Sequence, residues 1–517
     1  MILDIPNLSA TTYSLLAILL SICVYILWFY KDAYSYWKKR GLEYVEPMIP
    51  FGNTFSLFIK KTSMGMMFAK SYLHFKEKGL KHGGFYFFWK PIYVPVDPEI
   101  IKRVLISDFE NFPNHGFHIS ESEPMSGHIM NMENAKWRSL RAKYPAAFTS
   151  AKMRKMFVIM EKMTKQLIEN LEPHAVSGKS LDIKNELSRF TTDVISSCAF
   201  GLDTKTMKRE NEELLKRGRH FFDDQWNVYT NTLVFTIPRY ILKKFNFRLM
   251  PKEFETYFQD MFREVLNYRK GKQLNRGDIA DVLVRLTEKR EDEHDFTGKK
   301  PMDPLNFEEF AAQAVIFFSA GFETSSSTQT FALYELSKNP ECQEKLRDEI
   351  NEVLAKYDNK ITYDAVMDMK YLDKVIDETL RLYPVFPILP RVALNDYKVP
   401  GTDFTIEKNT LVLVSNMGIQ RDPEYYPNPD QFDPERFSVE NKSNRPFVAH
   451  IPFGEGPRIC VGKRFGLLQT KAGLISMLKR YRVSLSEKTT PSFKFVPHEL
   501  MLRKTGDIWI DLKKIST

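Results

Sequence analysis

The sequence predicts one large, mainly α-helical domain behind a single N-terminal membrane-spanning helix. Two long helical patterns, over residues 307–338 and 463–480, carry the helical prediction. An almost wholly apolar run, from Tyr13 to Tyr30, predicts the membrane-spanning helix. No linker rich in Gly, Ser or Pro divides the 517 residues after position 60, and the chain has no internal repeat. One folded unit is therefore expected rather than several domains.

The apolar run near the N-terminus is long enough to cross a bilayer. As a helix, Tyr13–Tyr30 spans about 27 Å, close to the roughly 30 Å thickness of the hydrocarbon core. Lys31 and the basic residues at 38–40 follow it, whereas Asp4 is the only charge before it, so the positive-inside rule predicts a cytoplasmic C-terminal domain. A cleaved signal peptide is the alternative, disfavoured because no basic segment precedes the run. The predicted organisation is a membrane anchor at 1–30, a basic and Pro-rich linker at 31–53, and the main domain at 54–517.

Charge and cysteine content exclude several classes of protein. The net charge of +9 is spread along the chain, which does not fit a nucleic-acid-binding arm but suits an anionic membrane surface or an acidic protein partner. The four cysteines (Cys23, Cys198, Cys342 and Cys460) are far apart and form no CxxC pair. A disulfide framework or structural zinc site is therefore not expected. A reducing compartment is expected for the protein instead.

Cys460 stands in a turn-rich loop directly before the helix predicted over 463–480. The loop reads Phe453-Gly454-Glu455-Gly456-Pro457-Arg458-Ile459-Cys460-Val461-Gly462. Its three glycines and one proline predict a tight turn that approaches another group closely. A cysteine ahead of a helix N-terminus meets backbone N–H groups and the positive end of the helix dipole, and Arg458 adds a cation. These features favour the thiolate. For an isolated cysteine, a buried turn residue is the alternative.

The pattern Phe453-x-x-Gly456-x-Arg458-x-Cys460-x-Gly462 resembles the haem-ligand loop of the cytochrome P-450 family. The resemblance implies the fold of that family, mainly α with a smaller β-rich subdomain, and haem b (iron protoporphyrin IX) as cofactor. It also implies that Cys460 is the thiolate ligand of the iron, that Phe453 packs near the sulfur and that Arg458 pairs with a haem propionate. Thiolate ligation favours O–O cleavage over reversible oxygen binding.

The helix predicted over 307–338 carries a second motif. It starts at a capping box formed by Asn306 and Glu309 and ends before Pro340. Within it, Ala320-Gly321-Phe322-Glu323-Thr324-Ser325 contains a mid-helix glycine, which indicates a close approach or a local break. The segment resembles the oxygen-binding helix of the same family. The resemblance implies that Thr324 assists oxygen activation and that Glu323 relays protons from water; core packing is the alternative for the segment alone.

Two further groups of residues resemble the scaffold and the cofactor cradle of the family. Glu378 and Arg381, an i,i+3 pair on a helix expected to end at Tyr383-Pro384, resemble with Arg436 a buried Glu–Arg–Arg network. The predicted propionate-binding residues are Trp137 and Arg141, four positions apart on a helix, and Arg391, whose rigid guanidinium suits a carboxylate.

His115 departs from the pattern of the branch that the chain resembles most in detail, the insect microsomal detoxification branch (family 6). That branch commonly carries an arginine at this position of the loop 114–117. A fourth propionate contact is therefore expected to be weak or pH-sensitive at His115, and an ordinary exposed loop histidine is the alternative.

The resemblance implies a monooxygenase that inserts one oxygen atom of O2 into lipophilic small molecules. The chain has no flavin or dinucleotide motif, so a microsomal NADPH–haemoprotein reductase is the expected electron donor, with cytochrome b5 as a further partner. Lys463 and Arg464 are expected to contact the acidic surface of the reductase. The expected location is the endoplasmic reticulum membrane, with the catalytic domain on the cytoplasmic face. A haem sensor, a lipophile carrier, or an isomerase or dehydratase of the same fold are alternatives that Glu323 and Thr324 disfavour.

The substrate class follows only from the branch. Xenobiotics such as plant toxins and insecticides are expected, and endogenous hormones or fatty acids are the alternative. Substrate contacts are expected from aromatic side chains in a greasy pocket. The segments and residues concerned are 110–125, 210–245, 385–390, 497–502, Phe221, Phe222, Phe317 and Phe386.

Overall fold

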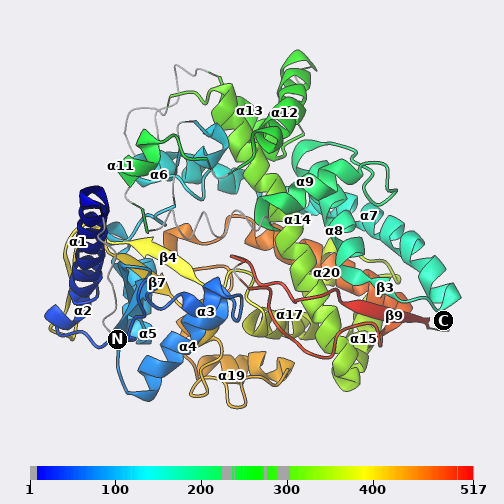
Figure 1. The fold of residues 1–517 in the computed structure, drawn as a ribbon. Helices are drawn as coiled ribbons and strands as arrows, with labels where there is room; N and C mark the ends of the chain where they lie inside the picture. Colours follow the sequence, from blue (N-terminus) through cyan, green and yellow to red (C-terminus); the bar gives the residue numbers. More distant parts are fainter. Residues whose placement is uncertain are drawn as a thin grey trace.

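Helices dominate the computed structural model, and short strands form small sheets beside them (Figure 1). The predicted mainly α fold with a smaller β-rich part is confirmed. The described residues are 9–117, 119–120, 122–223, 236–237, 239–248, 250–272, 276–288, 303–497 and 499–515. The helices are α1 Ala10–Ala33, α2 Tyr36–Lys39, α3 Phe55–Phe58, α4 Met64–Glu77, α5 Pro98–Lys102, α6 Asn134–Lys143, α7 Ser150–Ser177, α8 Ile183–Ile195, α9 Glu212–Asp223, α11 Arg239–Lys244, α12 Lys252–Lys272, α13 Ile279–Arg285, α14 Phe307–Lys338, α15 Pro340–Ala355, α16 Tyr363–Asp368, α17 Lys370–Leu382, α18 Asn416–Ile419, α19 Val439–Ser443 and α20 Lys463–Arg480. The strands are β1 His82–Phe87, β2 Lys90–Pro95, β3 Leu181–Asp182, β4 Leu389–Val392, β5 Tyr397–Lys398, β6 Thr405–Ile406, β7 Leu411–Val414, β8 Tyr481–Leu485 and β9 Trp509–Lys514.

The long helix α14 runs through the middle of the molecule and packs against α8, α12, α17 and α20 (Figure 1). Its predicted capping box is confirmed: the Asn306 side chain accepts a hydrogen bond from the Glu309 N–H, and the Glu309 carboxylate accepts one from the Asn306 N–H. The mid-helix glycine marks a close approach and not a break. A Cβ on Gly321 would lie 2.5 Å from Cγ1 of Ile195 in α8, so glycine lets the two helices come together.

The β-rich part holds a four-stranded sheet with strand order β1-β2-β7-β4, in which only the β2–β7 pair is parallel. A separate hydrophobic cluster lies around this sheet. Trp37 and Leu42, within the segment 31–53, are buried in that cluster, and the Trp37 indole N–H donates to the Phe85 carbonyl at 3.1 Å. Part of this segment therefore packs on the folded domain.

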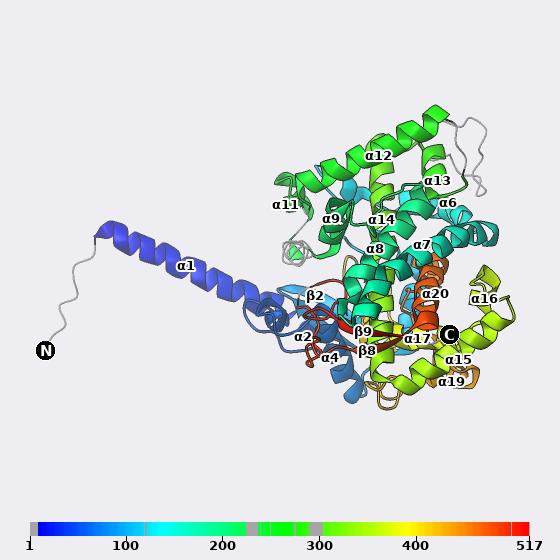
Figure 2. The ribbon, with the colours of Figure 1, turned by 90° about the vertical axis from the view of Figure 1, so that its right-hand side faces the viewer.

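The N-terminal helix α1 projects away from the body of the molecule (Figure 2). None of its residues is buried, and an 18-residue window within it has a mean hydropathy of 2.1. By length and composition, α1 could cross a membrane.

Candidate active site

The loop before α20 is held in shape by its own backbone and by one close approach. The Cys460 N–H donates to the Phe453 carbonyl at 3.0 Å, which closes the loop. Gly456 has a φ of 75°, and a Cβ there would lie 2.0 Å from the Leu105 carbonyl oxygen. Only glycine fits this position, so the predicted tight turn with a close approach is confirmed.

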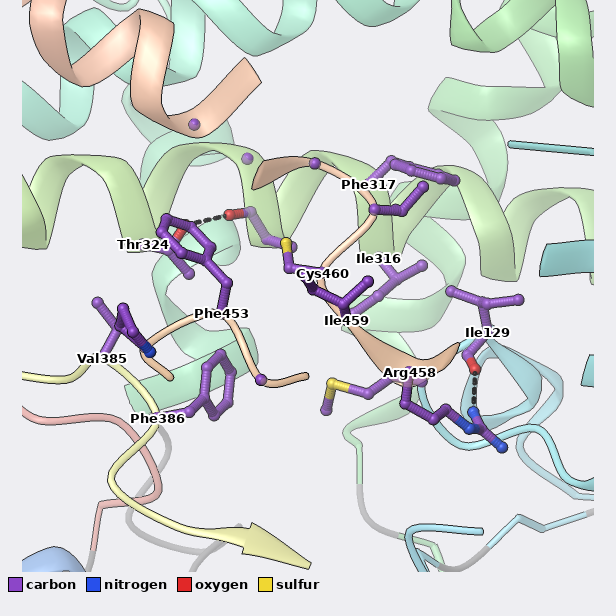
Figure 3. Close-up of a pocket in the computed structure, with 18 of the residues that line it drawn as sticks. Ile129, Ile316, Phe317, Thr324, Val385, Phe386, Phe453, Arg458, Ile459 and Cys460 are labelled. Atoms are coloured by element: carbon purple, nitrogen blue, oxygen red, sulfur yellow. Dashed lines mark hydrogen bonds between the residues drawn. The ribbon is translucent and has the colours of Figure 1, made fainter. Parts of the chain in front are cut away.

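Cys460 opens onto a cavity of about 310 Å³ between the loop and α14. Figure 3 shows Phe453 and Cys460 of the loop together with Phe317 and Thr324 of α14 among the residues that line it. Most of the remaining wall is apolar, with Val385, Phe386, Ile129 and Ile316 among its members. The structure therefore brings the two sequence motifs to one cavity.

The groups expected to favour a Cys460 thiolate are present, but they do not dominate. Burial raises the pKa of the Cys460 thiol above its ordinary value, against the opposing effects of the Gly462 N–H and the Arg141 and Lys463 charges. The backbone N–H groups at the helix terminus therefore act in the expected direction, but in the protein by itself burial outweighs them. Coordination to a metal ion deprotonates a thiol outright, so the ionised form would come with the metal.

Arg458 and Arg391 place two cations beside the cavity, Arg391 buried and Arg458 partly buried. The Arg458 guanidinium donates to the carbonyls of Pro113, Ile129 and Met132 at 2.8, 3.3 and 2.7 Å. It also lies 3.9 Å from the ring centre of Trp137. Burial lowers the pKa of Arg458 to about 9, and the nearby charge of Arg391 contributes to this shift.

Arg391, on β4, is only 2% exposed. Its Nη1 donates to the Pro390 carbonyl at 2.8 Å, whereas its Nε is buried without a hydrogen-bond partner. Burial lowers the pKa of Arg391 to about 10. Arg141 of α6 completes the basic set, and its Nη2 donates to the Ile459 carbonyl at 3.3 Å. The predicted residues Trp137, Arg141, Arg391 and Arg458 all line the cavity.

This charge distribution fits a dianionic cofactor. Among the described residues, no Asp or Glu lines the cavity, although the charge of Glu133 partly opposes the lowering of the Arg458 pKa. Buried guanidinium groups without a counter-ion are costly, so an anionic ligand would stabilise them. A haem supplies two carboxylates, a flat apolar ring and an iron for Cys460, and it therefore matches the donor set of this cavity.

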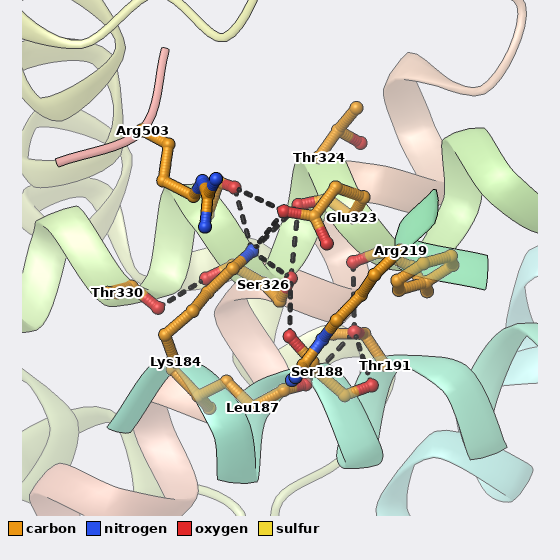
Figure 4. A network of polar contacts seen from close by, with 12 residues as sticks. Lys184, Leu187, Ser188, Thr191, Arg219, Glu323, Thr324, Ser326, Thr330 and Arg503 are labelled. Carbon is orange, nitrogen blue, oxygen red and sulfur yellow. Dashed lines mark hydrogen bonds and ion pairs between the residues drawn. The ribbon is translucent and has the colours of Figure 1, made fainter. Parts of the chain in front are cut away.

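Glu323 and Thr324 face different surroundings, although they are neighbours in sequence. Thr324 lines the cavity and donates its hydroxyl hydrogen to the Ala320 carbonyl at 2.7 Å. Glu323 is 4% exposed and pairs with Lys184 of α8, whose Nζ lies 2.5 Å from Oε1 (Figure 4). It lines a second, more polar cavity of about 330 Å³, and its Oε2 is buried without a hydrogen-bond partner. The acid and the hydroxyl therefore line two different cavities in this conformation.

Lys184 was missed by sequence reasoning. Its Nζ also donates to the hydroxyls of Ser326 and Ser327, at 2.8 and 2.9 Å. The pair joins residues 139 positions apart, and no local pattern predicts it. The serines at 325–327 were a weak signal, because consecutive hydroxyls on a buried helix need polar partners.

The expected substrate segments are partly represented in the cavity wall. Phe317 and Phe386 line it as expected. Phe221 does not line it, and its ring packs instead near His128 and Phe254, with centroid distances of 6.1 and 5.9 Å. The side chain of Phe222 and all of residues 224–235 lie outside the described residues.

The sequence model of the Cytochrome P450 family matches residues 47–510, and the chain therefore belongs to that family, whose members are haem-iron monooxygenases. It is 36% identical over 509 residues to Cytochrome P450 6a2 of Drosophila melanogaster, covering 97% of this chain and 100% of the relative. It is 37% identical to Cytochrome P450 6k1 of Blattella germanica, with 95% and 94% covered. It is 36% identical to Cytochrome P450 6A1 of Musca domestica, with 95% and 96% covered. The likeness to the insect family 6 branch is confirmed.

Proposed function

We propose that this protein is a haem-thiolate monooxygenase that inserts one oxygen atom of O2 into lipophilic small molecules. The observation that carries the proposal is the shared cavity, which Cys460 and Thr324 both line among apolar and basic side chains, with no acid among its described lining residues. A haem sensor or lipophile carrier would need neither a hydroxyl in the cavity of the cysteine nor a buried acid next to that hydroxyl in sequence.

The cofactor in this proposal is haem b, with Cys460 as the iron ligand. When bound, thiolate-ligated haem supplies the activation of O2 and the transfer of one oxygen atom to substrate. Arg391, Arg458 and Arg141 would bind the haem carboxylates, and Trp137 holds the Arg458 guanidinium in place by stacking. Phe453 packs in the wall beside the sulfur and excludes water from it.

The apolar wall supports a lipophilic substrate. Phe317, Ile316, Val385 and Phe386 line the cavity, and such side chains bind apolar ligands by excluding water. Xenobiotics, including plant toxins and insecticides, are the class that we propose, because the chain resembles the insect family 6 branch. Endogenous hormones and fatty acids are the second candidate class, since the same apolar wall would accept them.

Thr324 and Glu323 are the proposed proton-handling groups. The Thr324 hydroxyl donates to its own helix, so its oxygen lone pairs are available to accept a hydrogen bond in the cavity. Glu323 would take up protons from the polar cavity behind α14, and it would have to leave Lys184 before delivering them toward Thr324.

Replacing Thr324 with alanine is expected to lower product formation by on the order of 10²-fold, while NADPH oxidation continues, because electrons arrive but protons are misdirected. Parallel measurement of NADPH consumed and product formed, with reductase added, checks this coupling. Thr328→Ala is the matched control, since Thr328 lies one turn along the same helix and bonds the Thr324 carbonyl at 2.9 Å. Equal coupling in Thr324→Ala and the wild-type protein would contradict the role of Thr324.

A reductase and a membrane complete the proposal. Electrons would come from an NADPH–haemoprotein reductase, with cytochrome b5 as a second donor. Lys463 lies 5.5 Å from the ring centre of Phe453, and it is the better candidate for contact with an acidic partner. Arg464 is already engaged by the Phe148 carbonyl and the Ser150 hydroxyl. The helix α1 would anchor the protein in the endoplasmic reticulum membrane, with the catalytic domain on the cytoplasmic face.

The carbon-monoxide difference spectrum of the reduced, membrane-expressed protein tests the proposal. A strongly red-shifted Soret band is expected, because a thiolate pushes electron density onto the iron. A band typical of histidine ligation, or none in folded protein, would overturn it. Oxidation of lipophilic compounds with added reductase then separates xenobiotic from endogenous substrates.

A further inference from the structure

His115 lines the same cavity as Cys460, close to Arg391 and Arg458. Its Nδ1 lies 2.8 Å from the Met130 carbonyl oxygen. Because a carbonyl can only accept, Nδ1 must carry the hydrogen in this bond. The second ring nitrogen, Nε2, has no hydrogen bond among the described residues and is the nitrogen left to meet a ligand in the cavity.

The surroundings of His115 keep it neutral in the protein alone. Burial lowers its pKa well below the ordinary value of 6.5, and the charges of Arg391 and Arg458 act in the same direction, against the bond to Met130. The charged groups along this wall are Arg391 of β4, Arg458 of the cysteine loop and Arg141 of α6. No carboxylate lines the described part of this wall, and Glu133, which does not line it, only partly offsets the charge of Arg458.

A neutral His115 cannot hold a carboxylate. With its hydrogen fixed on Nδ1, the ring would present the Nε2 lone pair, and two acceptors repel each other. An incoming carboxylate also neutralises the arginines and adds a negative charge, and both effects favour the protonated imidazole. An arginine at this position would bind the carboxylate without any proton uptake.

We propose that His115 is a proton-linked partner of a haem carboxylate, with Nδ1–H fixed on Met130 and Nε2 taking up one proton from water when the carboxylate binds. The inference rests on the proposed haem site. It makes haem retention depend on pH through one residue of this chain.

The direction of the pH dependence follows from the linkage between proton binding at His115 and haem binding. The bound carboxylate raises the pKa of His115 above its value in the haem-free protein, so the protonated form favours the haem-bound state. This contribution is lost as pH rises through the pKa of the haem-bound form. One linked proton changes the affinity by at most about tenfold per pH unit.

Haem transfer from the full-length holoprotein to excess apomyoglobin tests the proposal, measured from pH 6 to pH 8.5. His115→Arg should hold haem independently of this proton, and His115→Gln should lack the protonated contact at every pH. The wild-type rate of haem loss is expected to match that of His115→Arg at low pH and to approach that of His115→Gln at high pH. Protonation of other groups affects all three proteins alike. The comparison therefore uses the ratio of the wild-type rate of haem loss to the rate of each His115 variant at the same pH. His74→Gln, at an exposed position on α4, should keep the wild-type profile.

A wild-type to His115→Arg ratio that stays constant with pH would overturn the proposal, as would a His115→Gln protein that retains haem as well as wild type at pH 6. Absence of haem from the wild-type protein would instead refute the proposed function itself, and the carbon-monoxide spectrum separates that failure from this one.

Discussion

Replacing Cys460 with alanine is expected to abolish both the red-shifted carbon-monoxide band and product formation. Among the described residues, Cys460 is the one cysteine that lines the cavity, so no other thiol there can replace it. Without a thiolate, haem would lose the ligand that favours O–O cleavage. The full-length variant in membranes should therefore show no thiolate-type band, and substrate turnover should fall to background.

Cys198→Ala is the matched control, because Cys198 is a second free cysteine and is buried away from the cavity. Its thiol donates to the Met156 carbonyl at 3.6 Å and does not line the cavity. Burial raises its pKa far above the ordinary value, so it stays a neutral thiol. This variant should keep the band and the activity. A thiolate-type band that survives in Cys460→Ala would show that another cysteine binds the iron and would refute the assigned ligand.

Features that depend on local sequence could be predicted closely. The helix over 307–338 has the predicted limits, because Asn306 and Glu309 cap its start and Pro340 begins the next helix. The helix over 463–480 likewise has the predicted limits. Caps, proline and hydrophobic spacing act over a few residues, so a sequence pattern records them directly.

The cavity that each of Glu323 and Thr324 lines could not be predicted from their being neighbours in the sequence. Neighbouring residues on an α-helix do not share a face, so the motif by itself predicts that one of them turns away from the cavity. Which one turns is decided by a long-range contact, the ion pair between Lys184 and Glu323. The surroundings of Arg458 are likewise decided by long-range contacts, because its three carbonyl partners come from a segment more than 300 residues earlier.

Glu378, Arg381 and Arg436, the residues of the predicted network, lie together in the structure. Glu378 and Arg381 have fully buried side chains, with Nε–Oε2 and Nη2–Oε1 distances of 2.6 and 2.8 Å. Arg436 Nε lies 3.5 Å from Glu378 Oε1. Arg381 also donates to three carbonyls, and the Asp433 N–H donates to Glu378. The carbonyls belong to Gln420, Pro429 and Gln431. The pair therefore ties α17 to the segment that precedes the cysteine loop.

Replacing Glu378 with glutamine is expected to destabilise the folded protein by about 3–5 kcal/mol, because it leaves the Arg381 charge buried without its counter-ion. Urea denaturation followed by far-UV circular dichroism, with the yield of folded protein, measures the effect. Glu352→Gln on α15 is the control, since its pair with Lys356 is exposed and should contribute little.

Arg381→Met should cost at least as much as Glu378→Gln, because it strands a buried carboxylate and frees three carbonyls. The double variant should lose less than the two single losses added together, since neither charge is then left alone. Strictly additive losses would show that the two residues act separately. In that case the carbonyl contacts of Arg381, and not its ion pair with Glu378, would be what holds α17 to the cysteine-loop side of the protein.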